Sequence, residues 1–394
     1  MQSDPHIVIA SRAATRLRDG HVWVYRSDLD SENSLPPGSV VQVKDQRGKF
    51  LGTAIYSSSS QIALRMISPA RLTAADLPKL IRERIREAIA YRRRVVRDTD
   101  AYRVIFSEAD MLPGLIVDRY ADILSLQVLT QAMDAPEVRP VVLETLQQEL
   151  QPAAIVERSE PRIRELEELS PSPTAPLFGD KTETIFTMNG VRFHYSAFAG
   201  QKTGAFLDQR ENYAAAESVA SGEALDVFCY QGGFALHLAR VCSQVTGVDS
   251  SRPALEAAER NAILNGRPEM EWVEANAFDL LRDYSAAGRL CDTIVLDPPA
   301  FARTKRNVDT ALAGYKELNL RALRMLRPGG ILITCSCSYH VSEADFIAVV
   351  ASAAGDAHRG LRIVEKRNQS KDHPSLPSVP ESSYLKCVIL AVSS

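Results

Sequence analysis

Apolar residues follow two different patterns along the chain, which divide the sequence near residue 190. In the first roughly 70 residues, short runs of strand-like composition are broken by turn residues such as Pro36-Pro37-Gly38, a pattern typical of a small β-barrel or sandwich. One longer segment, 76–97, instead places apolar residues three and four apart, which predicts a helix. After residue 190, apolar runs alternate with helical segments, and this alternation predicts an α/β fold with a parallel sheet covered on both faces.

These changes of pattern predict three domains. A small β domain spans residues 1–72, a middle α+β domain spans 73–188, and an α/β domain spans 189–394. The expected strands before the α/β domain are 22–25, 40–43, 50–56, 61–67, 102–106, 116–118, 123–129 and 154–157, with a second helix at 136–150. Residues 170–180 are rich in Pro and Ser, so we expect a connector there.

The composition is that of an ordinary globular protein, with 45% hydrophobic and 24% charged residues, which excludes disordered, collagen-like and coiled-coil classes. No apolar run approaches the roughly 18–20 residues that a membrane span needs, and the N-terminus is too polar for a secretory signal. The six cysteines form no CxxC pair, so we expect neither a metal site nor a disulfide framework. A cytoplasmic protein with reduced thiols is the expectation.

Charge is distributed unevenly along the chain. Residues 1–99 carry 17 Lys and Arg against 10 Asp and Glu, whereas the remaining residues carry 29 against 39. A basic N-terminal quarter on an acidic protein suggests a polyanionic partner. A solvated helix face explains the run Tyr91-Arg92-Arg93-Arg94 equally well.

The candidate chemistry lies where the strands of the α/β domain end. One apolar strand runs into Gly232-Gly233, the next ends at Asp249, and a third is followed by Asn276. A carboxylate at the second position can accept hydrogen bonds from ribose hydroxyls, so the three strand ends together predict a nucleoside cofactor. The chain lacks both G-x-G-x-x-G and a phosphate-binding lysine loop, which argues against a dinucleotide or a nucleoside triphosphate.

The fourth and fifth strands add a carboxylate and two thiols. Asp297 precedes Pro298-Pro299, and the fifth strand ends with Cys335 and Cys337, which the alternation of a strand would place on one face. A stiff turn and buried small side chains would account for these residues without any chemistry. Beside Asp297, however, a thiol is well placed to act as a nucleophile.

Together these motifs resemble those of class I S-adenosylmethionine-dependent methyltransferases. Within that class the chain is similar to the bacterial PUA-domain-containing 23S ribosomal RNA cytosine-5 methyltransferases. The resemblance spans nearly the whole chain and rests on Arg18–Trp23, Ser107–Arg119, Lys202–Arg210, Leu296–Phe301, Gly314–Asn319 and Ser336–Ser338.

The resemblance implies a doubly wound, Rossmann-like methyltransferase domain preceded by a PUA-like β-barrel and a middle α+β domain. It implies S-adenosylmethionine as cofactor, large-subunit rRNA or an assembling ribosomal subunit as partner, and no metal or membrane. The implied catalytic residues are Cys337, Asp297 and Pro298, and Lys202, Lys305 and Phe301 are candidate substrate contacts. The implied cofactor-binding residues are Gln209, Asp226, Phe228, Tyr230, Gly232, Gly233, Asp249, Ser250, Asn276, Ala277 and Asp297.

Two departures and two alternatives accompany this interpretation. Thr334-Cys335-Ser336 resembles the nucleophile motif of two-cysteine enzymes, but the Ser-Cys-Ser form around Cys337 is the one this family shares. Asn276 stands where the family usually has an acid, and its amide oxygen can still accept from the adenine amino group. The alternatives are a guanine N-methyltransferase of the same fold and a non-catalytic RNA-binding assembly factor. The sequence leaves open the target nucleotide, naked RNA or an assembled particle as substrate, the base that removes the C5 proton, and the oligomeric state, with a homodimer among the options.

Overall fold

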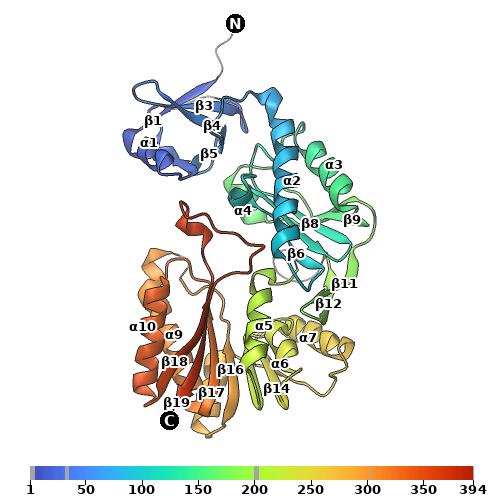
Figure 1. Ribbon diagram of the computed structural model, residues 1–394, viewed down its shortest axis with the longest axis vertical. Helices are drawn as coiled ribbons and strands as arrows, with labels where there is room; N and C mark the ends of the chain where they lie inside the picture. The colour runs from blue at the N-terminus through green and yellow to red at the C-terminus, as the bar shows by residue number, and fades with distance from the viewer. Residues whose placement is uncertain (1–4, 32–34, 199–203, 303, 394) are drawn as a thin grey trace. The chain divides into compact units, whose positions relative to one another are not determined.

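The computed structural model of the protein describes residues 5–31, 35–198, 204–302 and 304–393 (Figure 1). Its contacts divide the chain into two compact units. The first unit contains residues 1–186, 195–205 and 371–382, and the second contains 187–194, 206–370 and 383–394. The three-domain division at 72/73 and 188/189 stays a prediction.

The first unit begins with a five-stranded sheet in the order β1-β3-β4-β5-β2. Ile7, Ile9, Val41 and Val43 are fully buried in its core. A short first strand, which pairs in parallel with the third, and the helix after it were not predicted. The elements are β1 (His6–Ile9), α1 (Ser11–Arg18), β2 (Trp23–Tyr25), β3 (Val40–Asp45), β4 (Phe50–Tyr56) and β5 (Ile62–Ser68).

A second five-stranded sheet, in the order β10-β9-β8-β7-β6, follows in the same unit. Helices α2 and α3 lie side by side against it (Figure 1), and Ile81, Ile85 and Ile89 of α2 are buried in the shared core. The elements are α2 (Leu77–Val95), β6 (Ala101–Phe106), β7 (Leu115–Tyr120), β8 (Ile123–Val128), α3 (Arg139–Leu150), β9 (Ala154–Glu157), α4 (Pro161–Leu166) and β10 (Ala175–Phe178).

The expected connector at 170–180 contains the edge strand β10. The pattern concealed it because Pro176 is unusual in a strand, although an edge strand tolerates proline since one side of its backbone needs no partner. Helix α4 was not predicted either.

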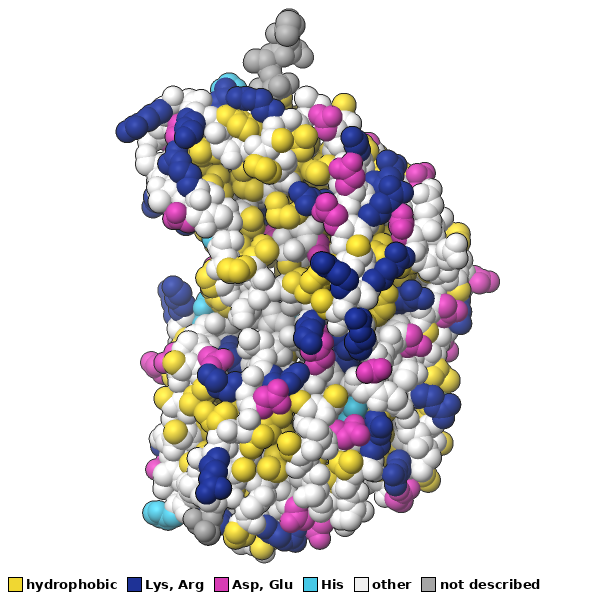
Figure 2. Space-filling view, in the orientation of Figure 1, with side chains coloured by type: hydrophobic (Ala, Val, Ile, Leu, Met, Phe, Trp, Pro, Cys, Tyr) yellow, Lys and Arg dark blue, Asp and Glu magenta, His cyan; other side chains and the backbone are white. Residues whose placement is uncertain are grey.

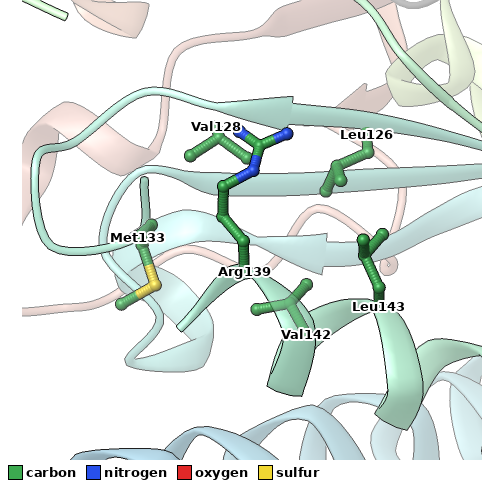
Figure 3. A pocket seen from close by; sticks show the side chains of 6 residues that line it. All are labelled: Leu126, Val128, Met133, Arg139, Val142 and Leu143. Carbon is green, nitrogen blue, oxygen red and sulfur yellow. The ribbon is translucent and has the colours of Figure 1, made fainter. Parts of the chain in front are cut away.

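A small hollow between α3 and this sheet is filled by side chains. Figure 3 shows Arg139 crossing it, and its guanidinium pairs with Glu157 and Asp134 at 2.6 Å each. The space left holds no water-sized volume, so it is part of the core rather than a ligand site. Its lining consists of Leu126, Val128, Met133, Arg139, Val142 and Leu143.

The second unit is built on a seven-stranded sheet in the order β15-β14-β13-β16-β17-β19-β18. The first five of these strands run parallel, and β19 runs antiparallel to both of its neighbours. Helices α8, α9 and α10 pack on one another and bury Leu225 and Val227 of the central strand, whereas α5 packs on α6. The strands are β13 (Glu223–Val227), β14 (Gln244–Asp249), β15 (Glu271–Glu274), β16 (Cys291–Leu296), β17 (Leu326–Ser336), β18 (Gly360–Arg367) and β19 (Lys386–Ser393).

The helices alternate with the parallel strands, as expected for a doubly wound fold. They are α5 (Arg210–Val219), α6 (Gly233–Leu238), α7 (Arg252–Leu264), α8 (Ala277–Ala286), α9 (Val308–Met325) and α10 (Glu343–Asp356). Before them, β11 (Glu183–Met188) and β12 (Val191–Ser196) form a two-stranded sheet. The carboxyl ends of β13, β14 and β16 therefore meet at one edge, which is where the predicted site residues lie.

Candidate active site

Asp226 lies in the central strand β13 and is almost fully buried. One of its carboxylate oxygens, Oδ2, accepts a hydrogen bond from the amide of Ala235 at 2.8 Å. The other, Oδ1, has no partner among the described residues. Burial raises the pKa of Asp226 to about 8, and the charges of Asp297 and Asp249 act in the same direction.

The loop after β13 has a backbone conformation that side chains rarely adopt. Phe228 and Tyr230 have φ values of 69° and 49°, and Gly232 has a φ of 83°. The amide of Tyr230 donates to Oδ2 of Asp249 at 2.9 Å, while Oδ1 accepts from the amide of Ser251 at 2.9 Å. Asp249 therefore holds the loop in place, and each oxygen keeps a second lone pair for a ribose hydroxyl.

The two glycines of this loop are required by packing as well as by the turn. Gly232 has a left-handed backbone conformation, which residues with a Cβ rarely adopt. At Gly233, an added Cβ would lie 2.5 Å from the ring of Tyr213. The sequence expectation was that these glycines let a ligand approach. The contact with Tyr213 shows that close helix packing also excludes a side chain there.

Asn276 caps helix α8. Its Oδ1 accepts hydrogen bonds from the amides of Phe278 at 2.9 Å and Asp279 at 3.3 Å. The amide oxygen that we expect to accept a hydrogen bond from the adenine amino group therefore already accepts from the first turn of the helix. The Nδ2 group is the part of this side chain that can donate to a ligand. Ser250 is exposed after β14, and Ala277 is buried in the first turn of α8.

Gln209, predicted as a cofactor contact, lies against Asp297. Its Nε2 donates to Oδ2 of Asp297 at 2.9 Å, and its Oε1 accepts from Asn212 at 2.6 Å. Gln209 is buried, so its amide is held in one orientation and fixes the direction of the carboxylate.

The two thiols of the fifth strand differ in environment. Strand β17 ends at Ser336, so Cys337 lies beyond the strand, and the expected sharing of one face does not apply. Cys335 is fully buried opposite Cys387, and burial raises its pKa well above the usual range. Cys337 is half-buried, with its Sγ 3.7 Å from the carbonyl oxygen of the buried Pro298.

A buried hydroxyl network holds the segment around Cys337. The hydroxyl of Tyr315 lies 2.9 Å from Oγ of both Ser336 and Ser338. Oγ of Ser338 also accepts from the amide of Ala302 at 3.1 Å, which ties this segment to the one that follows Asp297. The motifs Gly314–Asn319 and Ser336–Ser338 drew attention to these residues, but sequence reasoning gave Tyr315 and the serines no role.

Lys386, the first residue of β19, was missed altogether. Its ammonium donates to the carbonyl oxygens of Ser338 at 2.7 Å and Val341 at 2.9 Å. The available signal was a lysine that directly precedes the apolar run 387–392, where a strand buried on both faces is expected.

Residues 7–69 match the family model of a PUA-like domain, and residues 118–391 match that of the S-adenosylmethionine-dependent methyltransferases. The chain belongs to this methyltransferase family. Similar proteins include the ribosomal RNA large subunit methyltransferase I of Photobacterium profundum, 37% identical over 380 residues that cover 94% of this chain and 95% of the relative. The protein of the same name from Klebsiella pneumoniae is 35% identical over 391 residues, which cover 97% of each chain.

Solved structures agree on the fold. A protein described as a methyltransferase in complex with SAH has a TM-score of 0.83 and 20% sequence identity, and the match covers 98% of this chain and 100% of that chain. A protein described as a SAM-dependent methyltransferase from Streptococcus mutans has a TM-score of 0.82 and the same identity and coverage. The predicted α/β fold with an N-terminal PUA-like β domain is confirmed.

The cofactor of the methyltransferase is S-adenosylmethionine, as predicted. The site described above fits it, because Asp226 has a buried oxygen without a partner among the described residues and Asp249 has acceptor capacity for a ribose. The individual cofactor contacts, including those of Phe228, Tyr230 and Ser250, stay predictions.

The candidate substrate residues of the methyltransferase have different surroundings. The ring of Phe301 packs 4.9 Å from that of Tyr315, which anchors the segment after Asp297. Lys305 is exposed. Lys202 lies outside the described residues.

Two further kinds of feature are missing from the described part of the chain. Its histidine, cysteine and acidic side chains form no group of three suited to a metal ion. None of its helices is both long and apolar enough to cross a membrane.

Proposed function

We propose that the protein transfers the methyl group of S-adenosylmethionine to C5 of a cytosine in large-subunit ribosomal RNA, with Cys337 as the nucleophile. The observation that carries the proposal is the contrast between the two thiols. Cys337 is half-buried and contacts Pro298, the residue that directly follows Asp297. Cys335, in contrast, is fully buried within the sheet. The relatives, named ribosomal RNA large subunit methyltransferase I, support the substrate class.

The chemistry follows from the low reactivity of cytosine C5. The thiolate of Cys337 adds to C6, which makes C5 electron-rich enough to attack an electrophile. S-adenosylmethionine, when bound, would supply that electrophile as the methyl group on its sulfonium, and loss of the methyl group would leave the neutral thioether S-adenosylhomocysteine. A base then removes the C5 proton, the electron pair re-forms the C5–C6 double bond, and the thiolate leaves.

Asp297 would bind the edge of the base. Its carboxyl group is held by the amide of Gln209, so it is oriented before the substrate arrives. Hydrogen bonding near N3 and the exocyclic amine would stabilise the ring as charge develops during addition of the thiolate.

The target base must be unstacked to reach a thiol inside the domain, which favours a loop or an opened helix in the RNA. Basic residues of the first unit would supply sequence-independent affinity for phosphates. Figure 2 shows Lys and Arg side chains gathered over α2, where Arg93 and Arg94 are exposed. Phe301, Lys305 and Lys202 stay predicted substrate contacts, and a cytoplasmic location and a homodimer also stay predictions.

The test uses methyl-labelled S-adenosylmethionine and unmodified large-subunit rRNA, with the RNA digested to nucleosides for mass spectrometry. We expect labelled 5-methylcytidine from the unsubstituted chain and a loss of at least 1,000-fold in Cys337→Ala. Cys242→Ala, which removes another half-buried thiol, serves as the matched control and should keep full activity.

Two results would contradict the proposal. Labelled methylguanosine, with activity retained in Cys337→Ala, would identify nitrogen transfer without a thiol. Cofactor binding without transfer to naked rRNA or to a partly assembled subunit would identify a non-catalytic assembly factor.

A further inference from the structure

Lys386 is a lysine buried within the second unit. Its side chain is 7% exposed, and its strand, β19, pairs Lys386 with Ser336 of β17, one residue before Cys337. The two carbonyl groups that it binds, those of Ser338 and Val341, belong to the turn that follows Cys337. An ammonium group has three donors, so these two bonds orient Lys386 without using its full capacity.

The charges around this lysine come from several elements. Burial lowers the pKa of Lys386 to about 8, while the Cys337 thiolate and Glu343 of α10 act to raise it. Glu343 also pairs with Lys366 of β18 at 2.6 Å. From α9, Tyr315 faces Cys337, and burial is the main cause of its raised pKa. Just after β16, Asp297 directly precedes Pro298, whose carbonyl contacts Sγ of Cys337.

We propose that Lys386 is a positioning residue for Cys337, which holds the turn after the thiol in place and stabilises the thiolate with its positive charge. The inference rests on the proposed function, in which Cys337 is the nucleophile. A half-buried thiolate beside the phenol of Tyr315 would otherwise be disfavoured, because burial raises the pKa of a thiol. Burial leaves the ammonium little water to screen it, so its effect on a neighbouring thiolate is large.

The experiment measures the rate of Cys337 alkylation by iodoacetamide between pH 5.5 and 10 on the full chain, without cofactor or RNA. The modified peptide is quantified by mass spectrometry. Lys386→Met and Lys386→Gln remove the charge, and Lys386→Arg keeps it. Lys366→Met is the matched control, since it removes a lysine of the neighbouring strand, β18, that pairs with Glu343. Cys242, whose pKa burial raises to about 11, is an internal reference thiol.

In the unsubstituted chain we expect the midpoint of the alkylation profile below the ordinary thiol value of about 8.5. Both neutral variants should raise this midpoint by about one unit, which slows alkylation at pH 7 about tenfold. Lys386→Arg and Lys366→Met should leave the midpoint within a few tenths of a unit, and the profile of Cys242 should not move in any variant. Loss of the turn's anchor alone would change the rate at high pH without moving the midpoint.

An unchanged midpoint in the neutral variants would overturn the proposal. So would a midpoint at or above 9 in the unsubstituted chain, a result that does not depend on whether any variant folds. Failure of the proposed function has a different signature, because methyl transfer would then survive in Cys337→Ala whatever the alkylation profiles show.

Discussion

At the scale of single residues, the protonation of Asp226 makes a prediction about cofactor binding. Because the pKa of its buried carboxyl is about 8, Asp226 is mainly protonated at neutral pH in the free protein. The cofactor is a cation at its sulfonium and amino groups, and a cation bound nearby favours the ionised carboxylate. Binding should therefore release a proton below pH 8, and affinity should rise as the pH approaches 8 and level off above it.

Titration calorimetry in two buffers of different ionisation enthalpy measures that proton directly. We expect release of several tenths of a proton at pH 7, and none in Asp226→Asn. Asp249→Asn is the comparison variant: it removes a charge that raises the pKa of Asp226, so it should weaken binding and reduce the proton release without abolishing it. Equal enthalpies in the two buffers for the unsubstituted protein would contradict the prediction.

How far the sequence could predict the site depends on how each residue acts. Asp249, Asp297 and Cys337 lie at or just after strand ends, and the alternation of strands and helices brings such ends to one edge. The contacts of Lys386 and Gln209 could not be predicted in this way. Lys386 reaches Ser338 across 48 positions and Gln209 reaches Asp297 across 88, so only the folded sheet pairs them.

At the scale of elements, the pattern of apolar and turn residues was sufficient to predict the bounds of two strands that lie inside a sheet. Strands β4 and β9 begin and end where the sequence predicts. Prediction failed for β1 and β10, because a short edge strand has few alternating residues and takes its hydrogen bonds from a neighbour distant in the sequence. Helix α3 begins at Arg139 rather than at 136, with Pro140 in its first turn, which fits the preference of proline for helix starts.

The attachment of α6 to the turn between β11 and β12 depends on a neutral histidine. His237 is fully buried, with Nδ1 2.7 Å from the carbonyl of Gly233 and Nε2 3.2 Å from Nδ2 of Asn189. The imidazole must accept from the amide of Asn189, so a proton on Nε2 would break that bond. Burial accordingly lowers the pKa of His237 to about 4.

This lowered pKa predicts a loss of stability in acid. Between pH 6.5 and about 4 the unfolded chain binds a proton at His237 that the folded chain does not, so stability present above pH 6.5 is lost as the pH falls through this window. The free energy of unfolding should drop by about 3 kcal/mol from this group. Urea unfolding of His237→Gln, in a Trp23→Phe background that leaves Trp272 as reporter of the second unit, should show a correspondingly flatter pH dependence. Parallel curves for the two proteins would contradict the assignment.

At the scale of the whole molecule, the chain passes between the two units five times. The segment 371–382, which follows β18, belongs to the first unit, where the buried Arg92 donates to the carbonyl of Asp372 at 2.9 Å. No pattern in the sequence marks such a return, because an isolated loop has no periodicity of its own. A single cut at any one position therefore cannot separate the two units.

Within the first unit, the PUA-like sheet and the middle sheet are also joined, by a buried charge cluster. Arg65 of β5 pairs with Glu167 at 2.7 Å and with Glu108 at 3.4 Å. Trp23 donates to Glu108 at 3.1 Å, and Ser57 donates to Glu167 at 2.9 Å. Deletion of residues 1–72 would leave both glutamates without these partners, so point variants are the cleaner way to test what the PUA-like sheet contributes.

The same cluster makes a prediction about stability. Arg65→Met leaves the almost fully buried Glu167 without its cation, and removal of one partner of a buried ion pair costs about 3–5 kcal/mol. Arg65→Met combined with Glu167→Gln should cost less than the sum of the two single changes by at least about 1 kcal/mol, because the second change removes the uncompensated charge. Urea unfolding followed by Trp23 in a Trp272→Phe background measures the first unit, and cofactor affinity should be unchanged because the cofactor residues belong to the second. Strictly additive costs would show that the Glu167 carboxylate is stabilised by the hydroxyl of Ser57 rather than by Arg65, in which case the link between the two sheets would be made by a hydrogen bond from a neutral donor.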